Sequence, residues 1–356
     1  MIDIKKDSVL LNISKNENYE LPFLWLRDNC QCNECRIQET QEKQFLLHSV
    51  PVNITPSKIE LIDENIFVNW EDGHKTHIPL SLIRNSMKPR YPKYESWEDN
   101  FLPKKFKWDD FLNNKIVAVE ALKTFVTYGV IILNDAPQEP ESLELLSPRF
   151  GPIHETLFER IHNVSVTGHV YNVAHTSKGL PPHNDFASYQ AQPSVQALHM
   201  LVNECKGGES IIVDGWKVVE DLRNDCPEFF NILCEFHVPF REFDEKNETF
   251  AEAPLIECNL DGSIKSFRFS NQLMQMIRPN KKGILDFYKA YHEISSRVFN
   301  PKYQSTFRLN SGEVLIVASL RVLHARESFV PNGKRHLQDA YFVFDNAANN
   351  IVHLLS

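Results

Sequence analysis

Two residues in the stretch "LPPHNDF", His183 and Asp185, have the types and the spacing that suit a metal site. Side chains two positions apart project to the same side of an extended chain, so this imidazole and this carboxylate could bind one ion together. The tripeptide H-x-D also occurs by chance in loops, and two ligands leave a site incomplete. The interpretation therefore depends on a third ligand elsewhere in the chain.

His324 is the best candidate for that third ligand, because it follows "GEVLIVAS", a run with the character of a buried strand. Two histidines and one carboxylate make the facial triad of non-haem Fe(II) oxygenases, which leaves coordination positions open. His199 lies inside the apolar run "VQALHML" and is expected in the core, and His336 alternates to the wrong face of its strand. The sequence thus predicts Fe(II) bound by His183, Asp185 and His324.

An arginine opens the segment "RHLQDAYFVFD", eleven residues after His324. In the commonest chemistry of such iron sites, 2-oxoglutarate fills two open positions and O₂ takes the third. The far carboxylate of 2-oxoglutarate then needs an anchor, and a bidentate guanidinium suits it. We therefore predict that Arg335 binds 2-oxoglutarate. Alternation along a strand gives the same face to four residues: Arg335, Leu337, Asp339 and Tyr341.

A second cluster of ligand-type residues is "CQCNEC", which contains Cys30, Cys32 and Cys35. Adjacent side chains cannot all face one interior, so core filling does not explain three thiols at this spacing. Structural Zn²⁺ takes four ligands in a tetrahedron, with thiolates preferred. Reduced cysteines in a loop are the alternative. An iron–sulfur cluster usually needs a fourth cysteine, and none lies nearby.

The fourth zinc ligand is expected to be His74, in the turn "WEDGH" between two strand-like runs. His77 and His48 are less well placed. A bound zinc ion would stabilise an N-terminal module of under about 90 residues, a size at which a hydrophobic core alone contributes little. The predicted role of this zinc is therefore structural.

The elements that must position these residues form two regions. Residues 1–90 carry short, alternating strand-like runs, and we predict a β-rich zinc-binding domain there. Residues 91–107, rich in Pro, Lys and aromatics, are expected as a connector. Residues 108–356 mix helical and strand-like segments, which indicates an α+β domain built on an antiparallel sandwich or barrel. The segments expected to be helical are 109–129, 216–236 and 282–299; the strand-like ones include 130–135, 207–215, 312–319 and 335–345.

Composition narrows the partners of the chain. A net charge of −9 over 356 residues argues against nucleic-acid binding, which needs a basic surface. No apolar run reaches the length of about 18 residues that a membrane span requires, and the N-terminal residues do not resemble a signal peptide. Seven cysteines in this arrangement fit a reducing compartment. We expect a cytoplasmic protein.

The chain resembles the γ-butyrobetaine and trimethyllysine dioxygenases, within the wider group of taurine-dioxygenase-like oxygenases. The resemblance rests on "LPFLWLRDNCQCNEC", "WEDGH", "HND", "GGESIIVDG", "LRVLHAR" and "RHLQDAY". It implies a double-stranded β-helix (jelly roll) with flanking helices, a homodimer, and hydroxylation of an unactivated C–H bond of a small molecule by O₂ and 2-oxoglutarate. Because Asp185 is intact, hydroxylation is favoured over halogenation.

The resemblance also indicates which residues face the substrate. The aromatic cage for a trimethylammonium group corresponds to Phe158, His162, His175 and Tyr341, and the contacts to a substrate carboxylate correspond to Asn172 and Asn271. Two cage positions are imidazoles, which near neutral pH can carry charge and repel a cation. We therefore expect a small carboxylate-bearing or otherwise anionic substrate without a quaternary ammonium group.

Two alternatives remain open from the sequence. The first is a γ-butyrobetaine or trimethyllysine hydroxylase with an atypical cage. The second, from another class, is a non-catalytic metal-binding module, which predicts a broken triad or a missing 2-oxoglutarate anchor.

Overall fold

The computed structural model describes residues 2–157, 159–165 and 176–355. The chain divides into two compact units, Met1–Arg90 and Tyr91–Ser356. The segment 91–107, expected as a connector, lies in the second unit. Its Trp97 is buried there, stacks on Phe101 with ring centroids 4.6 Å apart, and donates its indole N–H to the Tyr128 carbonyl at 2.8 Å.

The first unit contains two antiparallel three-stranded sheets and two short helices. Alternation gives each sheet one buried face; Val9 and Leu11 from the first sheet, and Ile66 and Val68 from the second, are almost fully buried in one core. The elements are β1 (Ile2–Ile4), β2 (Ser8–Ser14), β3 (Glu17–Pro22), α1 (Phe23–Asp28), η1 (Leu47–Ser49), β4 (Pro56–Ile62), β5 (Asn65–Trp70), β6 (Lys75–Pro79) and α2 (Leu80–Ser86).

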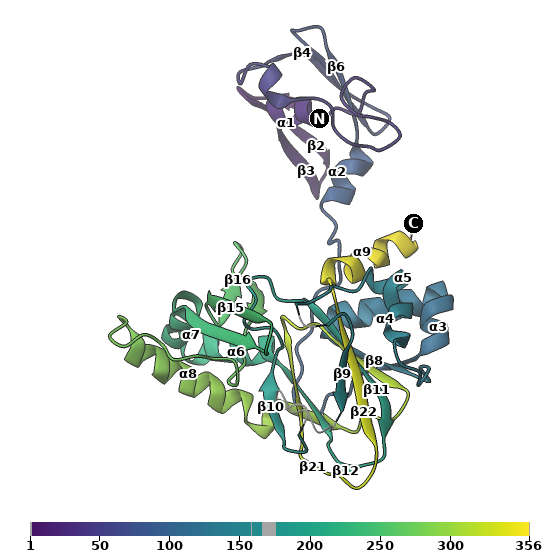
Figure 1. The fold of residues 1–356 in the computed structure, drawn as a ribbon. Coiled ribbons are helices and arrows are strands. Elements are labelled where there is room, and N and C mark those ends of the chain that lie inside the picture. The colour runs from purple at the N-terminus through teal and green to yellow at the C-terminus, as the bar shows by residue number, and fades with distance from the viewer. Residues whose placement is uncertain (1, 158, 166–175, 356) are drawn as a thin grey trace. The chain divides into compact units, whose positions relative to one another are not determined.

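The second unit is built on two sheets (Figure 1). The six-stranded sheet has the order β7 (Lys105–Lys107), β8 (Val130–Asn134), β19 (Glu313–Val317), β11 (Val195–Asn203), β22 (Arg335–Phe342) and β9 (His162–Ser165). The four-stranded sheet has the order β10 (Leu180–His183), β20 (Val322–Arg326), β13 (Ser210–Asp214) and β18 (Gln304–Phe307). Between β10 and β22 the chain passes repeatedly from one sheet to the other, as in a jelly roll. The predicted α+β fold with a β-rich N-terminal domain is confirmed.

Three strand pairs extend this framework: β12 (Lys206–Gly207) with β21 (Phe329–Val330), β14 (Val238–Phe243) with β15 (Glu248–Ala253), and β16 (Ile256–Cys258) with β17 (Ile264–Phe267). Helices cover the outside. They are α3 (Trp108–Asn113), α4 (Lys115–Tyr128), α5 (Ser147–Phe150), α6 (Gly215–Asp225), α7 (Pro227–Glu235), α8 (Ile284–Val298) and α9 (Phe344–Leu355), with the short turns η2 (Ser142–Leu146) and η4 (Pro301–Tyr303).

Two of the expected helices are each divided in two. Asn114 separates α3 from α4, because its side chain accepts hydrogen bonds from the N–H groups of Ile116 and Val117 and so begins a new helix. Pro227 opens α7 directly after α6, at the first helical position, where its missing N–H costs nothing. The expected glycine end of α4 is present: Gly129 has φ 76°, a left-handed conformation.

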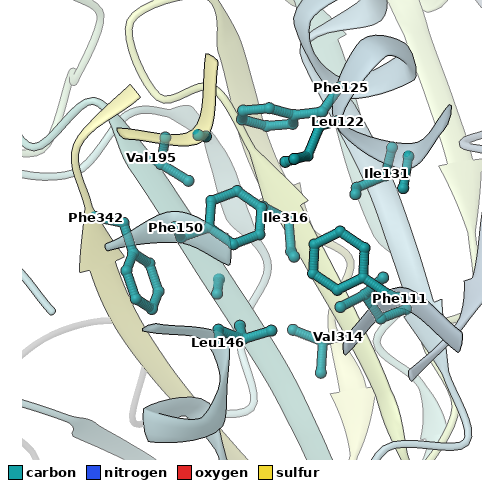
Figure 2. Packing of buried hydrophobic residues seen from close by; sticks show 14 of the residues in the cluster. Phe111, Leu122, Phe125, Ile131, Leu146, Phe150, Val195, Val314, Ile316 and Phe342 are labelled. Atoms are coloured by element: carbon teal, nitrogen blue, oxygen red, sulfur yellow. The ribbon is translucent and has the colours of Figure 1, made fainter. Parts of the chain in front are cut away.

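The main core lies between the six-stranded sheet and the helices α3, α4, α5 and α9. Figure 2 shows Phe111, Phe125 and Phe150 from these helices against Ile316 and Phe342 from the sheet. The rings of Phe125 and Phe150 meet edge to face, 5.8 Å apart. This core packs against one face of β11, β19 and β22, and residues on the opposite face of these strands line a cavity.

Candidate active site and metal-binding clusters

His183 and His324 are direct cross-strand partners, on β10 and β20. Their rings lie 4.3 Å apart between centroids, and Asp185 follows two residues after His183. Asp185 Oδ1 is 3.1 Å from His183 Nε2 and 3.9 Å from His324 Nε2. One ligand atom from each of the three residues lies within 4.8 Å of the others. The structure thus brings together the three residues that the sequence predicts as iron ligands.

The protonation states in this cluster suit a metal ion. The Nδ1 of His183 lies 2.9 Å from the Pro181 carbonyl, which accepts its hydrogen and leaves Nε2 as the free donor atom. Burial, and then His183, lower the pKa of His324 to about 4, so this ring is neutral near pH 7. Although burial opposes ionisation, His324 and His183 hold the pKa of Asp185 well below its usual range. The neutral ring of His324, the Nε2 of His183 and one carboxylate therefore converge.

Asn184, between two of these residues, points the opposite way and fixes the turn. It is fully buried, and its Nδ2 donates to the carbonyls of Phe267 and Ser319, at 2.5 and 3.1 Å. Its Oδ1 accepts from the Phe269 N–H at 3.0 Å. With the central residue of H-x-D tied to the backbone behind, the two flanking side chains are directed to the same side.

The second oxygen of Asp185 is held by a hydrogen-bond network. Oδ2 accepts from Gln196 Nε2 at 2.7 Å and from the Tyr341 hydroxyl at 2.7 Å. The same two donors lie 2.8 and 2.9 Å from Asp339 Oδ2. Gln196 and Tyr341 are register partners on β11 and β22, so sheet pairing places both donors. Such outer partners orient a metal-binding carboxylate.

These residues line a cavity of about 450 Å³, a size that suits a small ligand. Arg335, Leu337, Asp339 and Tyr341 all line it, as expected from alternation along β22. The Nε of Arg335 is buried without a hydrogen-bond partner, and no carboxylate pairs with this side chain among the described residues. Burial, and then Arg326, lower the pKa of Arg335 to about 10. An orphaned guanidinium of this kind fits an anionic ligand.

The residues expected to face the substrate lie in different places. His162 and Tyr341 line the cavity. Phe158, Asn172 and His175 lie outside the described residues. Asn271 is exposed and accepts a hydrogen bond from Tyr291 at 3.2 Å, and its two neighbours in the chain, not Asn271, line the cavity.

Gln196, Glu242 and Phe186 are among the cavity residues that sequence reasoning did not single out. Alternation in "SVQALHML" could have indicated Gln196, because it puts Gln196 on the face opposite His199. Glu242 lies on β14, in a stretch without any motif, and only the three-dimensional structure brings it to the cavity.

Cys30, Cys32, Cys35 and His74 form a second cluster, in the first unit. His74 Nε2 lies 3.3 Å from the Sγ atom of Cys30, 3.8 Å from that of Cys32 and 3.6 Å from that of Cys35. Tetrahedral zinc with ordinary bond lengths separates such N and S ligands by about 3.5 Å. Among the alternatives for the fourth ligand, His77 is hydrogen-bonded to Asn65 at 2.8 Å and His48 is exposed.

Comparison with known proteins defines the class. Residues 93–341 match the family described as Taurine catabolism dioxygenase TauD, TfdA family, and residues 2–79 match Gamma-butyrobetaine hydroxylase-like, N-terminal. The chain belongs to the TauD, TfdA dioxygenase family and carries an N-terminal domain of the γ-butyrobetaine hydroxylase-like type. The family uses Fe(II), 2-oxoglutarate and O₂ on small molecules. The Cys₃His cluster suggests zinc in the N-terminal domain.

Several relatives extend over nearly the whole chain. The γ-butyrobetaine dioxygenase of Pseudomonas sp. (strain AK-1) is 31% identical over 346 residues, covering 94% of this chain and 90% of that protein. Human γ-butyrobetaine dioxygenase is 26% identical (91% and 88% covered), and the mitochondrial trimethyllysine dioxygenase of Rattus norvegicus is 27% identical (92% and 81% covered).

Solved structures share the fold. The non-heme iron oxygenase OrfP, in complex with Fe and alpha-ketoglutaric acid, superposes with a TM-score of 0.50 at 16% identity, covering 67% of this chain and 84% of that chain. A taurine dioxygenase from Burkholderia xenovorans gives a TM-score of 0.50 at 13% identity, covering 72% and 91%. Across the described ranges, every helix is too short or too polar to cross a bilayer.

Proposed function

We propose that this dioxygenase hydroxylates an unactivated C–H bond of a small carboxylate-bearing or otherwise anionic molecule that lacks a quaternary ammonium group. The observation that carries the proposal is the convergence of His183, Asp185 and His324 on one side of a cavity that also contains the unpaired Arg335. We assign the first three residues as iron ligands and Arg335 as the anchor of 2-oxoglutarate.

The donor set supports Fe(II) at this site, because two imidazoles and one carboxylate match the facial triad and leave positions open. When bound, Fe(II) with 2-oxoglutarate supplies oxidation of a C–H bond by O₂, while 2-oxoglutarate becomes succinate and CO₂. The protein's residues do the remaining work. Gln196 and Tyr341 keep Asp185 Oδ2 turned away from the metal face, so that Oδ1 is presented with the two Nε2 atoms.

The absence of a quaternary ammonium group in the substrate is supported by the surroundings of His162. Its Nδ1 lies 3.3 Å from Asp339 Oδ1, and its Nε2 lies 3.2 Å from the Thr156 hydroxyl. Although burial opposes protonation, Asp339 raises the pKa of this imidazole. A ring held as one half of an ion pair offers a poor face to a second cation.

A substrate panel tests the proposal. Succinate release is measured with Fe(II), 2-oxoglutarate, O₂ and, in turn, γ-butyrobetaine, trimethyllysine and acids without a quaternary ammonium group. Turnover is expected with a member of the last group and is expected to disappear in Asp185→Ala, but not in Asp261→Ala, which changes an exposed loop carboxylate. Efficient turnover of either trimethylammonium compound would contradict the proposed substrate class.

One specific observation favours a second candidate. The 31% identity to the Pseudomonas γ-butyrobetaine dioxygenase extends over 94% of the chain, so γ-butyrobetaine or trimethyllysine hydroxylation with an atypical cage is the alternative function. The same panel separates the two candidates.

We further propose that Cys30, Cys32, Cys35 and His74 bind a structural zinc ion, and that the first unit contributes to a homodimer in a cytoplasmic protein. Large apolar side chains exposed on this unit support a contact surface: Leu46, Val52 and Ile62 are 62%, 83% and 49% exposed. Light scattering of the intact protein tests the dimer, and a Val52→Asp variant should shift the mass toward the monomer. None of the seven cysteines, all of which lie in the described residues, is in a disulfide, which supports a reducing compartment.

A further inference from the structure

Basic and acidic side chains lie at opposite ends of the cavity. Arg335 and Asp339 both line it, four residues apart on β22, which separates their Cα atoms by about 13 Å. Arg326 also lines the cavity, and its guanidinium and that of Arg335 lie 4.9 and 5.1 Å from the centre of the same Phe329 ring. We call this the cationic end. Asp339 lies at the opposite end. Glu242 also lines the cavity, and the charges that act on it are those of Asp185, His162, His183 and Asp339, so we place it with Asp339 at an acidic end.

Among the described residues, the two carboxylates of the acidic end have few hydrogen-bonding or positively charged partners. No hydrogen bond or ion pair joins the Glu242 side chain to another residue in the described part of the chain, and burial, followed by the charge of Asp185, raises the pKa of Glu242 to about 7. Asp339 is 5% exposed, and its Oδ1 makes no hydrogen bond. Its neighbour there is His162 Nδ1, at ion-pair distance.

The cationic side chains near the acidic end in the described part of the chain cannot balance both carboxylates. Arg241 lines the cavity, but it donates to Glu248 at 2.8 Å and lies over the Phe243 ring at 4.2 Å. A protonated His162 balances one carboxylate only. Asp185 and the two carboxylates of 2-oxoglutarate would offset bound Fe(II) and Arg335. The remaining positive charge, Arg326, lies at the cationic end, where its guanidinium donates to the carbonyls of Thr176 and Lys178. A carboxylate in such a setting either takes up a proton, as the raised pKa of Glu242 indicates, or pairs with a positive charge that a ligand supplies.

We propose that the acidic end binds a protonated primary or secondary amine of the substrate, with Glu242 and Asp339 accepting its N–H hydrogens. This inference rests on the proposed function and sharpens it: the substrate is a carboxylic acid that also carries an amine. A quaternary ammonium group has no N–H to donate and needs aromatic faces instead. The described rings at this end, His162, Phe186 and Tyr341, pack on one another at 4.9–6.0 Å.

Three probes with one carbon skeleton test the assignment: 4-aminobutanoate, butanoate and γ-butyrobetaine. The intact protein is loaded with Mn(II), which is redox-silent here and paramagnetic, and with 2-oxoglutarate. Relaxation of the probe's methylene signals in ¹H NMR then reports binding beside the metal. We expect the largest relaxation enhancement for the methylene signals of 4-aminobutanoate. Glu242→Gln should reduce that enhancement about tenfold, because a hydrogen bond to a charged group is lost.

Two further variants sharpen the comparison. Glu245→Gln makes the same chemical change three residues away, on an exposed carboxylate in the β14–β15 turn, and should leave the enhancement unchanged. Asp339→Asn should also weaken the amine probe. Tyr341 donates to Asp339 and also to the metal-site residue Asp185, so Asp339→Asn could disturb the metal site. The Mn(II) affinity of this variant is therefore measured as well.

Three results would overturn the inference. The first is a relaxation enhancement for 4-aminobutanoate no larger than that for butanoate, including no enhancement for either probe. The others are a larger enhancement for γ-butyrobetaine than for 4-aminobutanoate, and an unchanged enhancement for 4-aminobutanoate in Glu242→Gln. Failure of the proposed function has a different signature. In that case Mn(II) or 2-oxoglutarate does not bind, or Mn(II) binds equally well after Asp185→Ala, whatever the probe.

Discussion

The Tyr341 hydroxyl lies 2.7 Å from Asp185 Oδ2 and also reaches Asp339, so its single proton is shared between two carboxylates. Tyr341 was expected from the sequence to offer its ring to the substrate. The ring does line the cavity, but the hydroxyl is directed at the carboxylate beside His183. Tyr341 is therefore proposed as a positioning residue for the metal site as well as a wall of the cavity.

Replacing Tyr341 by Phe should weaken Fe(II) binding about tenfold, because the ring stays while one of two donors to Asp185 Oδ2 is lost. Anaerobic Fe(II) titration by calorimetry measures the effect. Tyr128→Phe is a matched control, since that hydroxyl donates to Glu95 at 2.9 Å on the surface. Equal Fe(II) affinity in Tyr341→Phe and wild type would show that Gln196 alone orients the carboxylate.

Replacing Asn184 by Ala should lower the free energy of unfolding by about 2–4 kcal/mol, because three buried backbone groups lose their partner. Urea denaturation followed by circular dichroism measures it. Asn224→Ala, an exposed position in α6, should change stability by less than about 0.5 kcal/mol. A loss for Asn184→Ala as small as the control's would mean that the turn does not depend on this side chain.

Arg335→Lys should raise the KM for 2-oxoglutarate about tenfold or more, since an ammonium cannot make the bidentate contact of a guanidinium. Initial rates of succinate formation over a range of 2-oxoglutarate concentrations give the value. Fe(II) affinity should stay near that of wild type, and Arg278→Lys, at an exposed position, should leave the KM unchanged. An unchanged KM in Arg335→Lys would assign the anchor to another residue, with Arg326 the next candidate.

Cys32→Ser should release zinc and destabilise the first unit, because a folding metal loses one of four ligands. Plasma mass spectrometry gives the zinc content, and thermal unfolding gives the stability. Cys258→Ser, which changes an exposed thiol outside the cluster, should retain both. Loss of turnover in Cys32→Ser with stability and assembly unchanged would contradict a purely structural role.

What the sequence predicts well depends on local spacing. His183 and Asp185 are two residues apart, and Arg335, Asp339 and Tyr341 share a face because strands alternate, so their grouping needs no knowledge of the whole fold. The helix over 109–129 was harder, because Asn114 begins a second helix by bonding to the backbone ahead of it. The capping hydrogen bonds of the Asn114 side chain outweigh the apolar periodicity that predicts one continuous helix.

Long-range features were not accessible in this way. Glu242 reaches the cavity through the β14–β15 pair, and nothing in its neighbourhood carries a chemical motif. Asn271 illustrates the reverse: the resemblance assigns it to a contact with the substrate carboxylate, yet in an irregular segment a shift of one residue decides which side chain faces the cavity. Ser270 and Gln272 do so, and Asn271 is exposed.

The cross-strand pairing of His183 with His324 has a consequence for synthesis of the protein. The two partners are far apart in the chain, and Arg335 comes later still, so a ribosome has made nearly all of the polypeptide before the site can assemble. Neither iron nor 2-oxoglutarate can then guide early folding, which must rely on apolar contacts such as those of Phe125 and Phe150. The thiol cluster is different, because all four of its residues lie in the first unit and leave the ribosome early. One metal can thus act during translation, and the other only at its end.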